Sequence, residues 1–85
     1  MKHVTAADRL HRRIERHPSA VIFEEPDGLL RACGFAHRPG KGSHHFYWRG
    51  EHRLTVPYRR PHVLEIYVNK ALAIIDQAER ERDHE

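Results

Sequence analysis

The middle of the chain, residues 35 to 56, holds three short strand-like segments separated by turn residues. Residues 35 to 38 end at Pro39-Gly40, and the aromatic run 43 to 49 is followed by Gly50-Glu51-His52 and then by residues 53 to 56. Pro-Gly pairs and isolated glycines mark tight turns, whereas short runs rich in aromatic and β-branched residues favour strands. The pattern therefore predicts three consecutive antiparallel strands.

The length of the loop between the second and third strands sets which side chains share a face. A three-residue loop over residues 50–52 pairs Arg49 with Arg53, and a shift by one residue would turn a whole strand over. The predicted core side of this hairpin consists of Phe46, Trp48, Leu54 and Val56. The predicted open side consists of His45, Tyr47 and Thr55. His44 nominally shares the core side but lies at its outer end.

Helical patterns flank the strands on both sides. Residues 5 to 17 begin at a capping Thr5 and carry an apolar stripe that includes Leu10 and Ile14. A second helix is expected from the acidic residues 24 and 25 to Gly34, which suits a left-handed C-terminal cap. The last helix runs to about residue 80 on a core stripe with helical spacing. That stripe consists of Leu64, Val68, Ala71, Ile75 and Ala78.

The order helix, helix, strand, strand, strand, helix predicts an α+β fold with the helices packed on one face of the sheet. With 85 residues the chain is expected to be a single domain over residues 1–85, with an N-terminal helical extension (1–20) and a core (22–80). The sequence has no signal-peptide pattern and no run approaching about 18 apolar residues. We therefore expect no membrane association and a cytoplasmic protein.

Charge is concentrated in the middle of the chain. Fifteen Lys and Arg residues against twelve Asp and Glu residues give a net charge of only +3. The central basic residues include Arg38, Lys41, Arg59 and Arg60, whereas the C-terminal end is acidic. A polyanionic partner for the basic centre and a solvated mixed-charge surface are both compatible with this distribution.

Two kinds of catalytic site are disfavoured by the sequence. The histidines have no standard zinc-ligand spacing, and Cys33, the only cysteine, is expected to be a small buried apolar residue. Neither Ser19 nor Ser43 stands in the sequence context of a hydrolase nucleophile. We therefore predict no metal and no cofactor.

Proton transfer by one histidine is compatible with the sequence. RNA cleavage needs no metal when the ribose 2′-hydroxyl is the nucleophile, and an imidazole can serve as its general base or acid. His44 would be the imidazole of such a site, and Lys41, Arg38 and Arg59 would hold the phosphate. From spacing alone, a purely structural role for His44, bonded to the backbone at a strand end, remains open.

The run GKGSHHFYWRGEHRLTVP, Gly40 to Pro57, resembles the core of the HicA family of bacterial toxins. In that family a Gly-Ser-His turn opens an aromatic strand, and a Val-Thr-Val-Pro-like strand leads into a C-terminal helix. The preceding LLRACGF also resembles the leucine-rich first helix of the family. The resemblance covers about residues 22 to 76.

This resemblance implies a double-stranded-RNA-binding-domain-like fold and a ribosome-independent mRNA endoribonuclease. It implies neutralisation by a HicB-like antitoxin, with the toxin either a monomer or part of a toxin–antitoxin hetero-oligomer. The family's catalytic histidine maps to His44, and the turn that presents it maps to Gly42 and Ser43. A non-catalytic module of the same fold that binds RNA or a partner protein is the alternative.

Further contacts with RNA are expected around His44. We predict phosphate contacts from Arg59 and Arg60, although the loop YRRPHVLEIYV differs from the lysine-rich segment usual in the family. Tyr47 is the predicted base-stacking residue, because it lies on the predicted open side of the sheet. His45 is expected to be an ordinary exposed strand residue.

Overall fold

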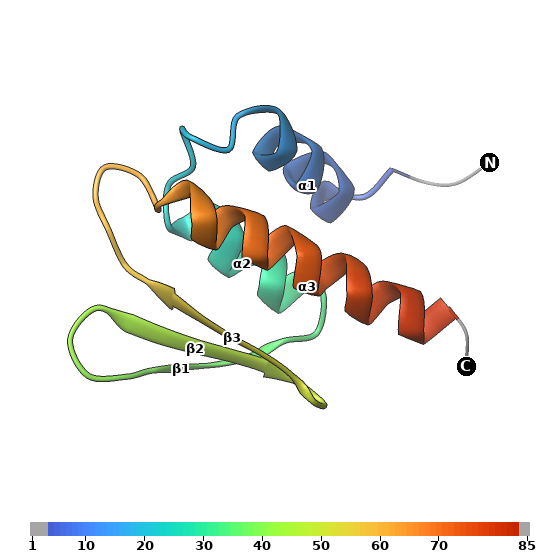
Figure 1. Ribbon diagram of the computed structural model, residues 1–85. Coiled ribbons are helices and arrows are strands. Elements are labelled where there is room, and N and C mark those ends of the chain that lie inside the picture. The colour runs from blue at the N-terminus through green and yellow to red at the C-terminus, as the bar shows by residue number, and fades with distance from the viewer. Residues whose placement is uncertain (1–3, 84–85) are drawn as a thin grey trace.

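The computed structural model of the chain describes residues 4–83. Its elements are α1 (Ala6–Arg16), α2 (Glu24–Ala32), β1 (Ala36–Pro39), β2 (His44–Arg49), β3 (His52–Pro57) and α3 (Glu65–Asp83) (Figure 1). The strands form one antiparallel sheet in the order β1-β2-β3. The predicted α+β fold and its order of elements are confirmed.

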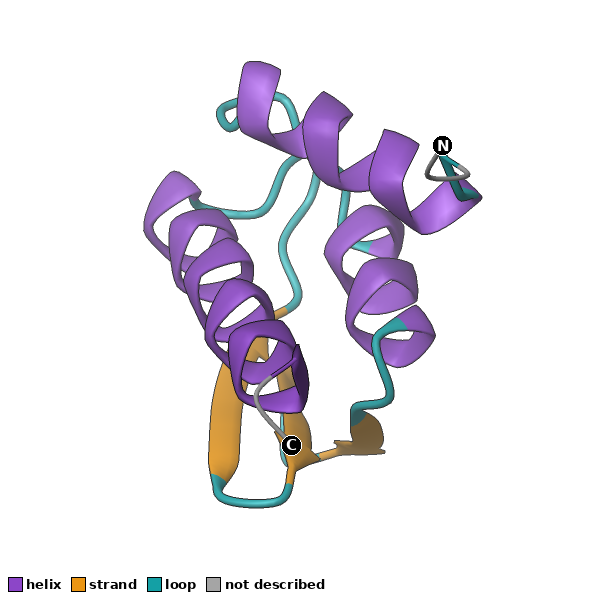
Figure 2. Cartoon of the chain, turned by 90° about the vertical axis from the view of Figure 1, so that its right-hand side faces the viewer, coloured by secondary structure: helices purple, strands orange, loops and turns teal. Residues whose placement is uncertain are grey.

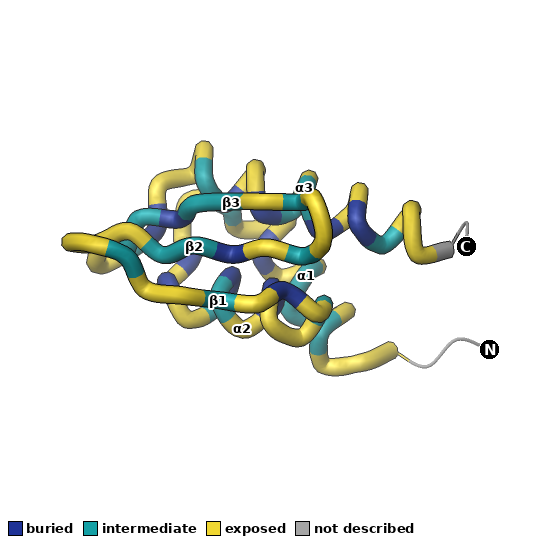
Figure 3. The backbone as a smooth tube through the Cα atoms, turned by 90° about the horizontal axis from the view of Figure 1, so that it is seen from below, coloured by how far each residue is buried: buried dark blue, intermediate teal, exposed yellow. Residues whose placement is uncertain are grey.

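The helices all lie on the same side of the sheet. Figure 1 and Figure 2 show α2 and α3 between the sheet and α1, which crosses over them on the side remote from the strands. Seen from below in Figure 3, the three strands lie in front of the helices, and none of the helices within residues 4–83 covers this face. One face of the sheet is therefore built into the core, and the other is open.

Local signals in the sequence explain where two of the helices begin or end. The Thr5 hydroxyl accepts a hydrogen bond from the Asp8 amide, and the Asp8 carboxylate accepts one from the Thr5 amide, which completes a capping box at the start of α1. Gly34 follows α2 with a φ of 87°, a conformation that residues with a Cβ rarely adopt. Both features agree with the prediction.

The core is a single cluster between the helices and the covered face of the sheet. Its fully buried side chains include Ile14, Val21, Leu29, Leu30, Val56 and Val68. The stripe predicted for the last helix is correct except at its first position, because Leu64 is 46% exposed. Val63 is buried in its place, and its amide donates a 2.8 Å hydrogen bond to the Val21 carbonyl.

The predicted register of β2 against β3 is wrong by one residue. Arg49 pairs with His52, so the loop is the two-residue Gly50-Glu51 rather than a three-residue turn. Tyr47 consequently pairs with Leu54 and faces the helices, where it is only 1% exposed. The predicted side of β3 is correct, but the whole of β2 is turned over, as a one-residue slip requires.

This change moves five β2 side chains to the face opposite the predicted one. Tyr47 and His45 face the helices instead of the open side, and Trp48 and Phe46 face the open side instead of the core. Trp48 is 40% exposed. His44, predicted at the outer end of the core side, also lies on the open face, with Phe46 and Trp48.

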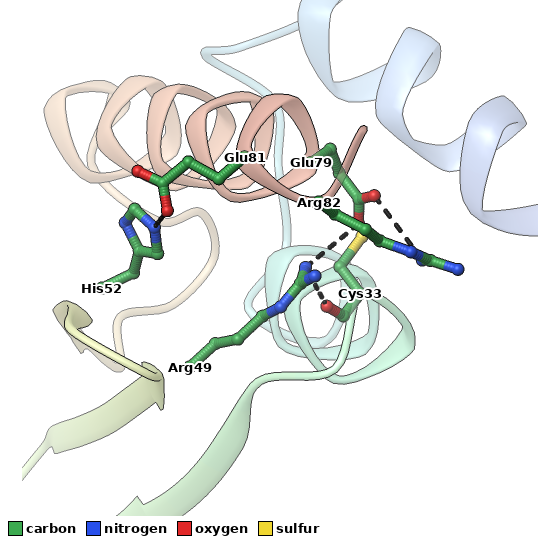
Figure 4. Close-up of polar contacts among 6 residues, drawn as sticks. All are labelled: Cys33, Arg49, His52, Glu79, Glu81 and Arg82. Atoms are coloured by element: carbon green, nitrogen blue, oxygen red, sulfur yellow. Dashed lines mark hydrogen bonds and ion pairs between the residues drawn. The ribbon is translucent and has the colours of Figure 1, made fainter. Parts of the chain in front are cut away.

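Arg49, at the end of β2, fastens the sheet to the helices. Its Nη1 donates to the Cys33 carbonyl oxygen at 2.8 Å and to Glu79 Oε1 on α3 at 3.2 Å (Figure 4). Nearby, His52 Nε2 lies 2.7 Å from a Glu81 carboxylate oxygen, a second link from the hairpin to α3. Arg49 is therefore used inside the protein and is not part of a free basic surface. Cys33, expected to be buried, is only partly so.

Candidate functional site

The segment between β1 and β2 folds as a tight turn that fixes the start of β2. The Gly40 amide donates to the His44 carbonyl at 2.8 Å, and the His44 amide donates to the Lys41 carbonyl at 3.3 Å. Gly42 has a φ of 62°, in the left-handed region that favours glycine. The Ser43 carbonyl accepts from the Tyr58 amide at 2.6 Å, which joins the turn to the segment after β3. Gly42 and Ser43 thus lie in the turn that precedes His44.

His44 is exposed at the first position of β2, with its ring held by one contact. Its Nδ1 lies 3.2 Å from the carbonyl oxygen of Lys41. A carbonyl can only accept a hydrogen bond, so Nδ1 carries the proton and the neutral ring keeps its lone pair on Nε2. The contact leaves Nε2 available to take up a proton from solvent or from a bound molecule, and the protonated ring can return one.

A shallow hollow on the surface surrounds this imidazole. It is lined by Arg38, Pro39, Gly40, Lys41, His44 and Phe46. The structure therefore brings His44 together with two of the predicted phosphate-binding residues, Arg38 and Lys41. Arg59 and Arg60 lie outside this lining, in the segment after β3. The Arg59 guanidinium donates to the His62 carbonyl at 3.0 Å, and that of Arg60 lies 5.4 Å from the centre of the Tyr58 ring.

Tyr47 is not available to stack on a base. Its ring is buried between the sheet and the helices, and its hydroxyl donates a 2.6 Å hydrogen bond to Asp27 Oδ1 on α2. Burial and the bond to this carboxylate raise the pKa of the phenol well above its usual range. Tyr47 is a neutral structural side chain, so its predicted position on the open face was wrong.

His45 and His37 also face the helices. With Arg31 they form a chain of polar contacts on the helix side of the sheet. An Arg31 guanidinium nitrogen lies 2.7 Å from His37 Nδ1, and His37 Nε2 lies 2.8 Å from His45 Nδ1. Because a guanidinium only donates, His37 accepts at Nδ1 and donates from Nε2 to His45. Burial and the Arg31 charge lower the pKa of His37. His45 is half-buried, and its ring centre lies 4.6 Å from that of Phe23, so it is not the exposed strand residue that was predicted.

The open face carries surface features that the predicted register hid. Phe46 and Trp48 lie on it with Arg53 and Thr55, and together with Arg38 they line a second hollow. The signal that could have revealed them is Gly50 at the start of the hairpin loop, with a φ of 58°. A glycine in the first of two loop positions is typical of a type II′ hairpin turn, which would have given the observed register.

Among residues 4–83, no three His, Cys, Asp or Glu side chains lie close enough together to hold a metal ion. Over the same residues, no helix is both long enough and apolar enough to cross a lipid bilayer.

Comparisons of the chain with protein-family models, with curated proteins and with solved structures find no match. The case for a function therefore depends on the chain's own residues and on the resemblance of the segment from Gly40 to Pro57.

Proposed function

We propose that this protein is a metal-independent endoribonuclease that acts as the toxin of a toxin–antitoxin pair, with His44 as its general acid or base. The observation that supports this most directly is the state of His44. His44 is exposed, its Nδ1 lies 3.2 Å from the Lys41 carbonyl oxygen, and it lines a hollow together with Arg38 and Lys41.

The proposed reaction uses a nucleophile that RNA itself supplies. A base removes the proton of a ribose 2′-hydroxyl, the 2′-oxygen attacks the adjacent phosphorus, and the bond from phosphorus to the 5′-oxygen breaks. An acid protonates that leaving oxygen, and the products are a 2′,3′-cyclic phosphate and a 5′-hydroxyl. Cationic side chains of Arg38 and Lys41 would stabilise the charge that develops on the phosphate.

The partner in this proposal is a HicB-like antitoxin that covers the hollow around His44. The support is the resemblance of the Gly-Ser-His turn and the strand that follows it to the HicA family. Arg59 and Arg60 retain a proposed role in contacting phosphates outside the hollow, because both are exposed and follow the segment that is hydrogen-bonded to Ser43. An antitoxin that fills the hollow would also block access of RNA to His44.

The His44→Ala substitution tests the catalytic assignment. We expect the parent protein to arrest growth and to cut RNA in EDTA, and the variant to lose both effects, since general acid–base catalysis contributes about 10²–10⁴-fold to a rate. His17→Ala is the matched control, because His17 is also exposed but lies at the end of α1, remote from the sheet. Toxicity of His44→Ala equal to that of the parent would remove the assignment.

A second candidate function is RNA binding without cleavage by the same surface. The observation that favours it is that, among residues 4–83, His44 is the only histidine that lines the hollow, whereas cleavage needs both a base and an acid. The other charged side chains that line the hollow are those of Arg38 and Lys41, which are cationic and suited to holding a phosphate. Tight RNA binding with no cleavage by the parent protein would select this second function.

A further inference from the structure

The open face of the sheet carries two aromatic rings in a row with His44, the exposed Trp48 and the half-buried Phe46. Side chains two positions apart on a strand point to the same side, so His44, Phe46 and Trp48 follow one another along β2 at intervals of about 6.8 Å. Trp48 is 40% exposed, and no helix covers this face (Figure 3). A tryptophan on the open face of the middle strand presents a broad flat surface to solvent.

The Phe46 ring is held in place from two directions. A Cβ atom at position 40 would collide with the ring, so Gly40 permits the turn to pack against it. The Arg38 guanidinium carbon lies 5.7 Å from the ring centre, from the neighbouring strand. The ring is therefore positioned beside the hollow that contains His44 rather than free to turn.

Cationic side chains accompany the two rings on both outer strands. Arg38 lies opposite Phe46 on β1, and Arg53 lies opposite Trp48 on β3. The three strands contain no Asp or Glu, and the acid nearest to them along the hairpin is Glu51 in its loop. The hollow around His44 and the hollow around Trp48 share Arg38 and Phe46, so they form one continuous surface.

We infer that this surface binds a single-stranded segment of RNA, with bases stacked on Phe46 and Trp48 and phosphates held by Arg38 and Arg53. Exposed aromatic rings stack on unpaired bases, whereas the bases of a duplex already stack on each other and do not offer their faces. The absence of acids from the strands favours a polyanion over an acidic or neutral protein partner. This inference deepens the proposed function, on which it rests, by assigning its substrate class: RNA that is unpaired next to the bond that is cut.

The test uses His44→Ala protein, so that binding is measured without cleavage, and a labelled oligoribonucleotide that is offered either alone or annealed to its complement. Phe46→Leu and Trp48→Leu keep an apolar side chain but remove the aromatic face. We expect each to weaken single-strand binding by about 5- to 160-fold, which corresponds to the usual strength of one base–aromatic stack. The matched control is Ile66→Ala, because Ile66 is 58% exposed but lies on α3. It should leave Kd unchanged.

Trp48 also reports on the contact directly, because it is the only tryptophan of the chain. Its fluorescence should change when the single strand binds and should not change with the duplex at equal concentration. Unchanged affinity in both leucine variants would overturn the inference. So would a result in which Trp48→Leu alters only self-association or antitoxin binding, since the face would then be a protein interface.

The same set of proteins separates this inference from the proposed function. If the parent protein cuts no RNA but its single-strand binding depends on Phe46 and Trp48, the catalytic proposal fails and the inference stands. If cleavage depends on His44 while both leucine variants bind and cut like the parent, only the inference fails.

Discussion

Replacing Tyr47 and Trp48 by alanine in separate variants tests the register of the sheet, because these neighbours on β2 point to opposite faces. Tyr47 is 1% exposed, and its hydroxyl donates to Asp27 at 2.6 Å. Truncating a buried aromatic residue destabilises a protein by about 3–5 kcal/mol. For Tyr47→Ala we therefore expect a loss of about 4 kcal/mol.

Trp48→Ala should have a much smaller effect on the free energy of unfolding. Its ring is 40% exposed on a face that no helix covers, so its removal leaves no enclosed cavity. Surface and strand-propensity effects of this kind amount to about 1 kcal/mol or less. The two substitutions should thus differ by about 3 kcal/mol, with the smaller side chain giving the larger loss.

Urea unfolding followed by far-UV circular dichroism measures both free energies. A chain of 85 residues has a total stability of about 4–13 kcal/mol, so Tyr47→Ala can unfold the protein outright. Tyr47→Phe provides a graded test, because it removes only the hydrogen bond to a carboxylate and should cost about 1.5–3 kcal/mol. Equal losses in the free energy of unfolding for the two alanine variants, or a larger loss for Trp48→Ala, would refute the observed register of β2 against β3.

Three further predictions follow from single contacts. Gly42→Ala should destabilise the fold by about 1–2 kcal/mol, because φ is 62° and only backbone strain opposes the added methyl group; an unchanged melting temperature would contradict this. Arg49→Ala should destabilise by about 2 kcal/mol in urea unfolding, since the Cys33 carbonyl and Glu79 both lose their donor; a loss below about 0.5 kcal/mol would contradict the bridging role. The pKa of His37 is lower in the folded protein than in the unfolded chain, so below about pH 6.5 the unfolded chain binds more protons than the folded one. The contribution of His37 to the free energy of unfolding is therefore present above about pH 6.5 and is lost as the pH falls below that value. In urea unfolding, the drop in stability between pH 7 and pH 5 should be smaller for His37→Gln than for the parent protein. An equal drop in the two proteins would contradict this prediction.

The parts of the fold that could be predicted from the sequence depend on neighbours along the chain. Thr5 and Asp8 cap α1 by contacts three residues apart, and Gly34 adopts the left-handed conformation expected of it at the end of α2. The position of His44 after the turn is equally local, since the turn's own hydrogen bonds fix it.

The register of β2 could not be read from apolar pattern alone, because both choices give a plausible core. Phe46 and Trp48 are as apolar as the residues that are buried. Tyr47 carries a hydroxyl, which favours an exposed position unless it has a buried hydrogen-bond acceptor, and here Asp27 is that acceptor. That partner is 20 residues away on α2. The placement of Tyr47 was therefore decided by a tertiary hydrogen bond and by the two-residue loop, neither of which hydrophobic alternation reveals.

The orientation of β2 also explains why the candidate site was only partly predicted. Arg38, Lys41 and His44 converge because the turn brings β1 and β2 together. Phe46, Trp48 and Arg53 join them only when β2 is turned so that its aromatic rings face solvent.

The most direct measurement of the central claim compares two RNA oligonucleotides that differ only in the ribose at the bond that is cut. One is all-ribose, and the other has a single 2′-deoxy nucleotide on the 5′ side of that bond. If His44 activates the 2′-hydroxyl, the parent protein will cut the first in EDTA, leave the second intact, and yield a 2′,3′-cyclic phosphate, whereas His44→Ala will cut neither. Cleavage of the 2′-deoxy oligonucleotide at the same bond, or cleavage that EDTA abolishes, would contradict the account.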